Sequence, residues 1–140
     1  IKGEEEKIEK EIKKILAINP EVYCYTVRVP VMFGHLEAVW LDLEQDVEVE
    51  DIIADWAGFK EVADLPSTPE LPVEYGSDNT FPQPKYAFWG KPSGMVVYTG
   101  RLKKKNNKIG FLLLVNNIVK GAAGGSIQNA EAFVKRFGLI

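Results

Sequence analysis

Residues 94–116, GMVVYTGRLKKKNNKIGFLLLVN, contain the two clearest strand patterns of this chain. Residues 94–102 and 109–116 are rich in Val, Leu, Tyr and Phe, which favour extended backbone, and the lysine-rich residues 103–108 separate them. Two such runs with a short polar break predict a β-hairpin whose turn is basic.

The segments before this hairpin predict a mixture of helices and strands. Isoleucines at helical spacing among glutamates and lysines predict an amphipathic helix that is closed by Asn19-Pro20. β-Branched and aromatic residues predict strands over residues 22–29 and 36–44. Apolar residues at positions 49, 52, 53 and 56 predict a short helix that ends at Gly58.

The remaining segments are irregular except for the C-terminus. Five of the eight prolines lie in residues 66–84, so we expect an extended crossing there without regular structure. Residues 121–125, GAAGG, predict a glycine-rich turn, and the apolar stripe that follows predicts a last helix from Ser126. The order helix, strand, strand, helix, hairpin, helix predicts an α+β fold with a mixed or antiparallel sheet covered by helices.

Length and charge limit the classes of function. A chain of 140 residues is in the usual range of one domain, and 46% hydrophobic and 26% charged residues are ordinary for a globular protein. A net charge of −3 argues against nucleic acid as a partner, because phosphate binding normally needs a basic surface. With no apolar run of about 20 residues and no signal-peptide pattern, we expect a cytoplasmic protein with no membrane partner. Because the chain opens at Ile1 without methionine, we also expect it to be the C-terminal piece of a longer polypeptide.

Arg28 and the only histidine, His35, lie seven positions apart, at and just beyond the end of the expected strand 22–29. A guanidinium grips a carboxylate through two parallel hydrogen bonds, and an imidazole transfers a proton near neutral pH. Gly34 lets the backbone bend beside the histidine. We interpret the pair as candidates for substrate anchoring and acid-base catalysis in one pocket. An edge-strand ion pair for Arg28 and a surface or core position for His35 remain as alternatives.

Two weaker candidates have simpler interpretations. The glycines of residues 121–125 follow a strand and precede a helix, as in a phosphate-binding loop, but their spacing is not G-x-G-x-x-G. A tight turn near a ligand, or close packing of the last helix, fits them better. Cys24 is the single cysteine, which agrees with a reducing compartment, and its β-branched and aromatic surroundings indicate a buried, inert thiol.

Several blocks of the chain together resemble one enzyme family. They are, in order, EEEK at 4–7, KKIL at 13–16, RVPV at 28–31, GHLE at 34–37, PQP at 82–84, GRL at 100–102 and NIVKGAAGGS at 117–126. The set resembles the C-terminal part of aspartate-semialdehyde dehydrogenase, and its glycine block is similar to that of the archaeal and fungal branch. That branch also resembles the acyl-coenzyme A reductases that make malonate semialdehyde.

The resemblance implies roles in binding and turning over the substrate. His35 matches the family's acid-base histidine, and Arg28 matches the arginine that clamps the substrate α-carboxylate. Glu4 matches the glutamate that accepts hydrogen bonds from the substrate amino group, and Lys7 matches the lysine that helps to hold phosphate.

The resemblance also implies a cofactor and a division of the chain. The family uses NADP, and the residues that lie where it reaches the nicotinamide are Asn117, Gly121 and Ala122. Residues 1–125 would form part of a catalytic and dimerisation domain that resembles the glyceraldehyde-3-phosphate-dehydrogenase-like C-terminal domain. Residues 126–140 would form a helix that packs on a dinucleotide-binding domain absent from this chain. We expect a homodimer or a tetramer.

The activity implied is the reduction of aspartyl phosphate to aspartate semialdehyde with NADPH, with release of phosphate, in lysine, threonine and methionine biosynthesis. The family's nucleophile is a cysteine in an upstream Asn-Cys motif, and its dinucleotide fingerprint is N-terminal. This chain contains neither, so we expect it to be inactive alone. Two alternatives remain, namely a malonyl- or succinyl-coenzyme A reductase on the same scaffold and a non-catalytic binding or assembly module.

Overall fold

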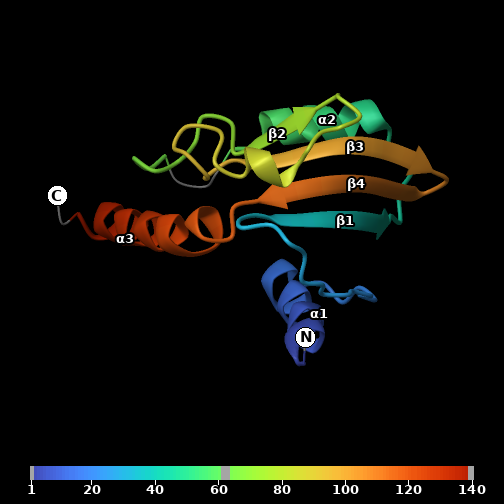
Figure 1. Ribbon diagram of the computed structural model, residues 1–140, viewed down its shortest axis with the longest axis horizontal. Coiled ribbons are helices and arrows are strands. Elements are labelled where there is room, and N and C mark those ends of the chain that lie inside the picture. The colour runs from blue at the N-terminus through green and yellow to red at the C-terminus, as the bar shows by residue number, and fades with distance from the viewer. Residues whose placement is uncertain (1, 61–63, 139–140) are drawn as a thin grey trace. The chain divides into compact units, whose positions relative to one another are not determined.

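The computed structural model describes residues 2–60 and 64–138, which fall into two compact units divided between Val31 and Met32 (Figure 1). The first unit contains one helix, and the second contains a sheet with its helices. Within the described ranges, no helix has both the length and the apolar composition needed to cross a membrane.

The first unit begins with α1, Glu4–Leu16, which confirms the predicted amphipathic helix. Ile8 and Ile12 lie one helical turn apart on its half-buried side. The helix ends at Ala17, whose φ of 54° is left-handed, two residues before the Asn19-Pro20 step that was expected to close it.

The strand expected over residues 22–29 is wrong. Their side chains do alternate as in a strand, and Tyr23 and Tyr25 are 88% and 93% exposed. The segment instead contacts α1, where the Thr26 N–H donates to Glu5 Oε1 at 2.8 Å. A strand needs a neighbouring strand to complete its hydrogen-bond ladder, and no strand in the described part of the chain pairs with this segment.

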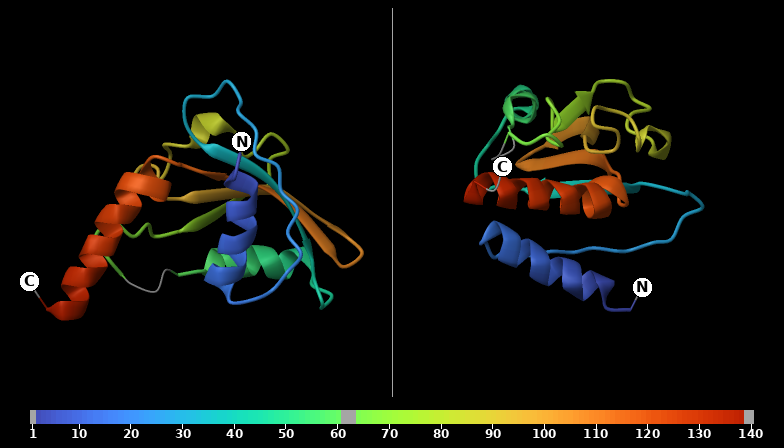
Figure 2. Two further views of the ribbon diagram at one scale, coloured as in Figure 1. Left: turned by 90° about the horizontal axis from the view of Figure 1, so that it is seen from below. Right: turned by 90° about the vertical axis from the view of Figure 1, so that its left-hand side faces the viewer.

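The second unit contains a four-stranded sheet in the order β1-β4-β3-β2 (Figures 1 and 2). Its strands are β1 His35–Asp42, β2 Val73–Gly76, β3 Val97–Lys105 and β4 Lys108–Val115. β4 pairs antiparallel with β1 and with β3, and β2 pairs parallel with β3. The predicted α+β fold with a mixed sheet is therefore confirmed. The prediction of an irregular crossing over residues 66–84 missed β2, because four residues directly after Pro72 are too short to show a strand period.

The β3–β4 hairpin is confirmed, but its turn is shorter than the basic run suggested. Only Asn106 and Asn107 separate the strands, and Asn106 has a φ of 54°, a left-handed conformation that Asn tolerates. The lysines therefore lie mostly on the strands. Lys104 Nζ lies 2.7 Å from Asp46 Oδ1 and 2.7 Å from Glu48 Oε1. These hydrogen bonds, the one to Asp46 having the larger effect, raise the pKa of the Lys104 ammonium group.

Both faces of the sheet carry packed segments. The predicted second helix, α2 Val49–Gly58, covers one face, and its Trp56 packs edge-on against Phe111 of β4 with ring centroids 5.1 Å apart. On the other face, residues 81–96, which include the short helix η1 Pro84–Tyr86, cover Tyr98 and Leu114. These two side chains are 2% and 0% exposed. The core therefore lies at the end of the sheet where β1 begins and β4 ends.

The chain passes from β4 into helix with only a short break. A π-helical turn, η2 Val119–Ala123, continues into α3, Gly124–Phe137, which leads away from the sheet (Figure 2). The glycine-rich turn expected over residues 121–125 is therefore wrong, and α3 begins two residues before Ser126. A Cβ on Gly124 would lie 2.6 Å from the Met95 sulfur, so this glycine permits close packing of the helix.

Candidate functional site

His35 is the first residue of β1 and lies at the end of the sheet that also holds the end of β4. It pairs with Val115 in the antiparallel ladder, and its side chain is exposed. Gly34 before it has a φ of 94°, and a Cβ there would lie 3.0 Å from Leu114 Cδ1 and 3.2 Å from Ala87 Cβ. Only glycine suits this bend, and the bend presents the imidazole at a strand end that a ligand can reach.

Asn117 follows β4 and binds the turn before β1. The Gly34 N–H donates to Asn117 Oδ1 at 2.9 Å, which joins residues 83 positions apart in the sequence. Across residues 2–60 and 64–138, the Asn117 amide nitrogen donates to no protein group. Both N–H donors of this amide are therefore left for a ligand.

Asn116, which the sequence reasoning missed, anchors the same turn and is 1% exposed. Its amide nitrogen donates to the Ala87 carbonyl at 2.9 Å, and its Oδ1 accepts from the backbone N–H groups of Ile118 and Val119 at 3.0 and 2.8 Å. The signal that could have revealed it is an amide residue between an apolar strand and a helix, which is a common capping position.

Gly121 and Ala122, the other expected cofactor contacts, lie in η2 and are exposed. The Gly121 N–H donates to the Asn116 carbonyl at 3.0 Å. This amide is therefore used within the protein. What the two residues offer a ligand is an exposed helical surface without bulky side chains.

Arg28, Glu4 and Lys7 belong to the first unit. Arg28 Nη2 lies 3.4 Å from Glu4 Oε1, and the two side chains are 75% and 46% exposed. Lys7 lies one turn along α1 from Glu4 and pairs with Glu11 at 3.6 Å. Exposed ion pairs contribute at most about 1 kcal/mol, so a charged ligand can replace them. Arg28 and Glu4 together offer one cation and one anion, which suits a ligand that carries a carboxylate and an ammonium group.

The structure thus gathers the expected site residues into two groups. Arg28, Glu4 and Lys7 form one group in the first unit, and His35 with Asn117 forms the other in the second. The expectation that Arg28 and His35 face one ligand stays a prediction.

Cys24 does not have the features of a nucleophile. Desolvation, followed by the charges of Glu9, Glu5 and Glu6, raises the pKa of its thiol. The thiol also donates to the Glu5 carbonyl at 3.6 Å. A thiol with a raised pKa keeps its proton near neutral pH, which supports the interpretation of Cys24 as inert. The expectation that it is buried is wrong, because Cys24 is only half-buried.

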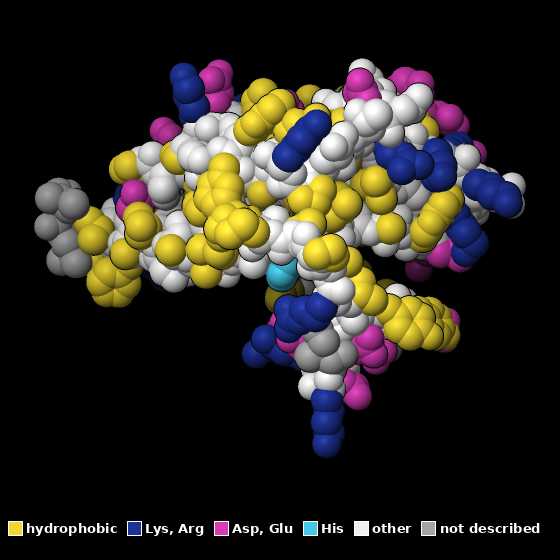
Figure 3. Space-filling model, in the orientation of Figure 1, with side chains coloured by type: hydrophobic (Ala, Val, Ile, Leu, Met, Phe, Trp, Pro, Cys, Tyr) yellow, Lys and Arg dark blue, Asp and Glu magenta, His cyan; other side chains and the backbone are white. Residues whose placement is uncertain are grey.

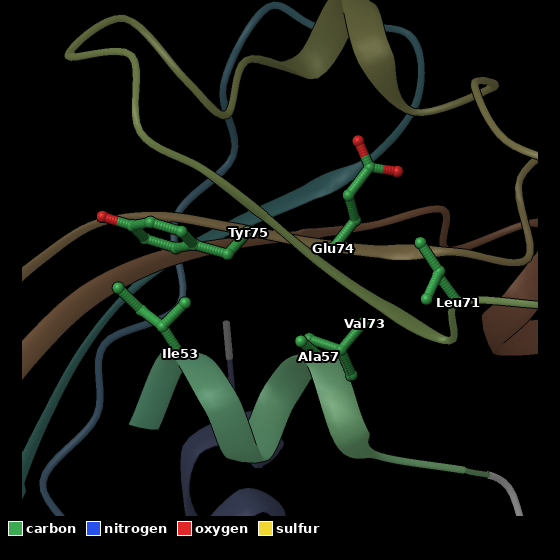
Figure 4. Close-up of a pocket in the computed structure, with 6 residues that line it drawn as sticks. All are labelled: Ile53, Ala57, Leu71, Val73, Glu74 and Tyr75. Carbon is green, nitrogen blue, oxygen red and sulfur yellow. The ribbon is translucent and has the colours of Figure 1, made fainter. Parts of the chain in front are cut away.

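A hollow of about 200 Å³ lies between α2 and β2 (Figure 4). It is lined by Ile53, Ala57, Leu71, Val73, Glu74 and Tyr75. Figure 4 shows that the carboxylate of Glu74, the single charged group of this lining, points away from α2. The hollow lies beside β2, whereas His35 lies on β1 at the opposite edge of the sheet. None of the expected site residues lines the hollow. We interpret it as a gap in the apolar packing of α2 on the sheet.

Known proteins resemble the chain in sequence and in fold. Residues 2–120 match the family model described as semialdehyde dehydrogenase, dimerisation domain. Aspartate-semialdehyde dehydrogenase of Archaeoglobus fulgidus is 36% identical over 147 aligned positions, which cover 96% of this chain and 42% of that protein. A malonyl CoA reductase (NADP) of Metallosphaera sedula is 36% identical over 116 positions, covering 79% of this chain and 32% of that protein. The crystal structure of aspartate semialdehyde dehydrogenase with NADP from Candida albicans has a TM-score of 0.79 and 28% identity, covering 100% of this chain and 44% of that one. The chain thus spans less than half the length of each of these proteins.

Proposed function

The chain belongs to the semialdehyde dehydrogenase family through its dimerisation domain, and we propose that it is the substrate-anchoring, dimer-forming part of a longer aspartate-semialdehyde dehydrogenase. The complete cytoplasmic enzyme would reduce aspartyl phosphate to aspartate semialdehyde with NADPH and release phosphate, in lysine, threonine and methionine biosynthesis. The observation that carries the proposal is the family match over residues 2–120, which includes His35, Arg28, Glu4 and Lys7.

His35 would act as the acid-base group. It would take the proton of a cysteine thiol supplied by another part of the longer polypeptide, so that the thiolate bonds to the acyl carbon and phosphate departs. After the acyl carbon has received a hydride, which NADPH would supply, His35 would return the proton to sulfur as the carbon–sulfur bond breaks and the aldehyde is released. Proton transfer by a positioned side chain contributes about 10² to 10⁴ in rate.

Arg28 and Glu4 would bind the amino-acid end of the substrate. In this role the guanidinium pairs with the α-carboxylate, and Glu4 accepts hydrogen bonds from the α-ammonium group. The 3.4 Å separation of the two side chains supports this assignment, since an amino acid carries its two charges close together. Lys7, one helical turn away, would help to hold the phosphate group.

Asn117, Gly121 and Ala122 would contact NADPH, which supplies the hydride when bound. The amide nitrogen of Asn117, which donates to no protein group in the described part of the chain, suits a carbonyl acceptor such as that of a carboxamide. The exposed Gly121 and Ala122 have no side chains that obstruct an approaching ring. These residues therefore fit one side of a nicotinamide.

The last helix would pack on the dinucleotide-binding domain of the longer protein. One side of α3 carries large apolar residues that are more than half exposed, namely Ile127, Phe133 and Phe137. A continuous apolar stripe of this kind usually marks a surface that another domain covers. The same interpretation divides the chain into residues 1–125, part of the catalytic and dimerisation domain, and residues 126–140.

A second copy of the chain would cover part of the sheet. Trp40 pairs with Gly110, next to Phe111, and so projects from the face opposite to α2. This side chain is 54% exposed and lies beside Arg101 and Lys103 in a shallow hollow of about 120 Å³. Figure 3 shows hydrophobic side chains at the surface of the second unit and basic side chains gathered near the β3–β4 turn. Since the family domain is described as a dimerisation domain, we assign this face to a homodimer, which could pair further into a tetramer.

The test is the oxidation of aspartate semialdehyde by the full-length protein, followed as NADPH formation with and without phosphate. We expect activity that requires both NADP and phosphate, and a loss of about 10²-fold or more in kcat for His35→Ala with a modest change in KM. An active protein that is insensitive to His35→Ala or Arg28→Leu would reject these residue roles. A folded full-length protein without activity on either substrate class would favour the non-catalytic module.

A malonyl- or succinyl-coenzyme A reductase is the second candidate, favoured by the 36% identity to the malonyl CoA reductase. A substitution at Glu4 distinguishes the two candidate activities. Aspartyl phosphate has an ammonium group for Glu4 to bind, whereas malonyl-coenzyme A has none at that position. We expect Glu4→Gln to lower kcat/KM with the aspartyl substrate at least tenfold, and Glu9→Gln on the same helix is the matched control. Activity confined to coenzyme A thioesters and unchanged by Glu4→Gln would favour the second candidate.

A further inference from the structure

A single side-chain hydrogen bond connects the turn before β1 with the turn after β4. In it the Gly34 N–H donates to Asn117 Oδ1 at 2.9 Å. Gly34 directly precedes His35, whose own backbone is paired with Val115, two residues before Asn117. The backbone on both sides of the histidine Cα is therefore held by one short segment, residues 115–117.

This segment is itself held firmly. Asn116 is 1% exposed and makes hydrogen bonds to the Ala87 carbonyl and to two backbone N–H groups at the start of η2. Ala87 is 3% exposed, belongs to the core cluster, and is the residue that a Cβ at Gly34 would approach at 3.2 Å. Asn117 thus extends from a fixed base toward a turn that packs on the same core residue.

The bend at Gly34 needs such a restraint. Its φ of 94° belongs to a region that glycine alone enters readily, and glycine is also free to leave it. A hydrogen bond to its N–H restricts that freedom. Since reaction rates fall by about 10²-fold when a catalytic group moves by about 1 Å, such a restraint affects turnover more than it affects binding.

We propose that Asn117 is a positioning residue for His35, acting through the Gly34 amide rather than through the imidazole. This inference rests on the acid-base role proposed above for His35. Position 117 therefore requires a side chain with an acceptor oxygen, because its hydrogen-bond partner is the Gly34 N–H. Because that oxygen is occupied, Asn117 can serve NADPH only through its amide nitrogen.

The experiment compares Asn117→Asp with Asn117→Leu in the full-length protein at saturating NADP and phosphate. Asp retains an acceptor oxygen, whereas Leu has a similar size and none. We expect Asn117→Leu to lower kcat about tenfold or more, with KM for aspartate semialdehyde within about twofold. Asn117→Asp should retain several-fold more kcat than Asn117→Leu but less than the original protein, because both variants lack the amide donor proposed for NADPH. Asn79→Leu, at an exposed position in the turn after β2, is the matched control and should retain the original kcat.

A double-mutant cycle with His35→Ala decides how Asn117 acts. If Asn117 works through His35, adding Asn117→Leu to His35→Ala should lower kcat by no more than about twofold further. A tenfold further loss, or equal losses for the Asp and Leu variants, would overturn the inference. A normal kcat for Asn117→Leu together with a low kcat for His35→Ala would overturn the inference about Asn117 and leave the proposed role of His35 intact. A normal kcat for His35→Ala would overturn the proposed role of His35 together with it.

Hydrogen exchange gives a second measurement that does not depend on activity. The Gly34 amide should exchange faster in Asn117→Leu than in Asn117→Asp, while amides in the middle of β1 keep their protection. Unchanged protection of Gly34 in a folded Asn117→Leu protein would contradict the inference.

Discussion

At the scale of the residue, the substrate binding proposed for this chain would depend on the geometry of one exposed ion pair. Arg28 Nη2 lies 3.4 Å from Glu4 Oε1, and both side chains can turn toward a ligand because neither is buried. A guanidinium presents two parallel donors in one plane, whereas an ammonium is a point charge. Under the proposed role, the type of cation at position 28 would therefore matter as much as its charge.

Substitution at Arg28 separates charge from geometry. We expect Arg28→Leu to lower kcat/KM for aspartate semialdehyde by about 10²-fold, because it removes a charged contact that also orients the reacting carbon. Arg28→Lys should recover only part of that loss. Steady-state kinetics of the full-length protein measures both, and full activity of the lysine variant would show that charge alone suffices.

Tyr98 is the residue whose protonation most clearly couples to stability. Desolvation, and then the charge of Glu74, raises the pKa of its phenol from 10 to about 12. The folded protein therefore keeps this proton up to about pH 12, whereas the unfolded chain loses it near pH 10. Its contribution to stability is complete below pH 10 and disappears as the pH rises toward 12.

Tyr98→Phe tests this coupling. Between pH 10 and 12, the urea midpoint of the original protein should fall more steeply than that of the Phe variant, which has no phenol to ionise. Tyr25→Phe is the matched control, because that ring is 93% exposed. Parallel slopes for the original and Tyr98→Phe proteins would contradict the prediction.

At the scale of the element, the helical segment after β4 depends on glycine for packing. A Cβ on Gly124 would lie 2.6 Å from Met95 Sδ and 2.9 Å from Val119 Cγ1, whereas a Cβ on Gly121 would meet nothing closer than the Asn116 carbonyl at 3.7 Å. The two glycines lie in the same continuous stretch of helix. They differ mainly in the room around them.

We therefore expect opposite effects from two alanine substitutions. Gly124→Ala should lower the free energy of unfolding by about 1–3 kcal/mol, because the added methyl group must displace the Met95 sulfur and the Val119 side chain. Gly121→Ala should be neutral or stabilising by up to about 1 kcal/mol, since alanine favours helix. Urea unfolding measures both, and equal destabilisation by the two substitutions would contradict this account.

At the scale of the whole molecule, two of the exposed apolar surfaces in the described part of the second unit suit contacts with another domain or another copy. One is the stripe on α3, assigned above to a further domain, and the other is the sheet face around Trp40. Lys103 lies over the Trp40 ring, 5.8 Å from its centre, so the face combines an aromatic surface with a cation at its border. That combination is common where two proteins meet.

Trp40→Glu should weaken self-association. A carboxylate buried in a two-fold interface appears on both copies and lacks a partner, which is costly. We expect the dimer dissociation constant of the full-length protein to rise at least about tenfold by analytical ultracentrifugation. Phe59→Glu, which introduces the same charge at an exposed aromatic residue just after α2, is the control. Unchanged association of the Trp40 variant would place the dimer interface elsewhere.

Local sequence patterns predicted the helices and the long strands. The isoleucine spacing of α1, the apolar positions 49–56 of α2 and the two runs of the hairpin each contain their own period, and all four elements formed. The residue types at Arg28 and His35 also predicted substrate anchoring and acid-base catalysis, and this stays a prediction. Such features are local, because a helix or an amphipathic strand expresses its pattern within a few turns or residues.

The tertiary structure decided whatever depends on distant partners. Residues 22–29 have the composition of a strand and form none, whereas β2, with almost no pattern, forms one because β3 pairs with it. The glycines after β4 lie in a helix rather than a turn, and Met95 and Val119 leave no room for a side chain at Gly124. Asn116 and Asn117 acquired their roles only when β4 brought them beside Ala87 and Gly34. The physical reason is that strand pairing, close packing and hydrogen bonds between turns join residues far apart in sequence, and local composition does not specify them.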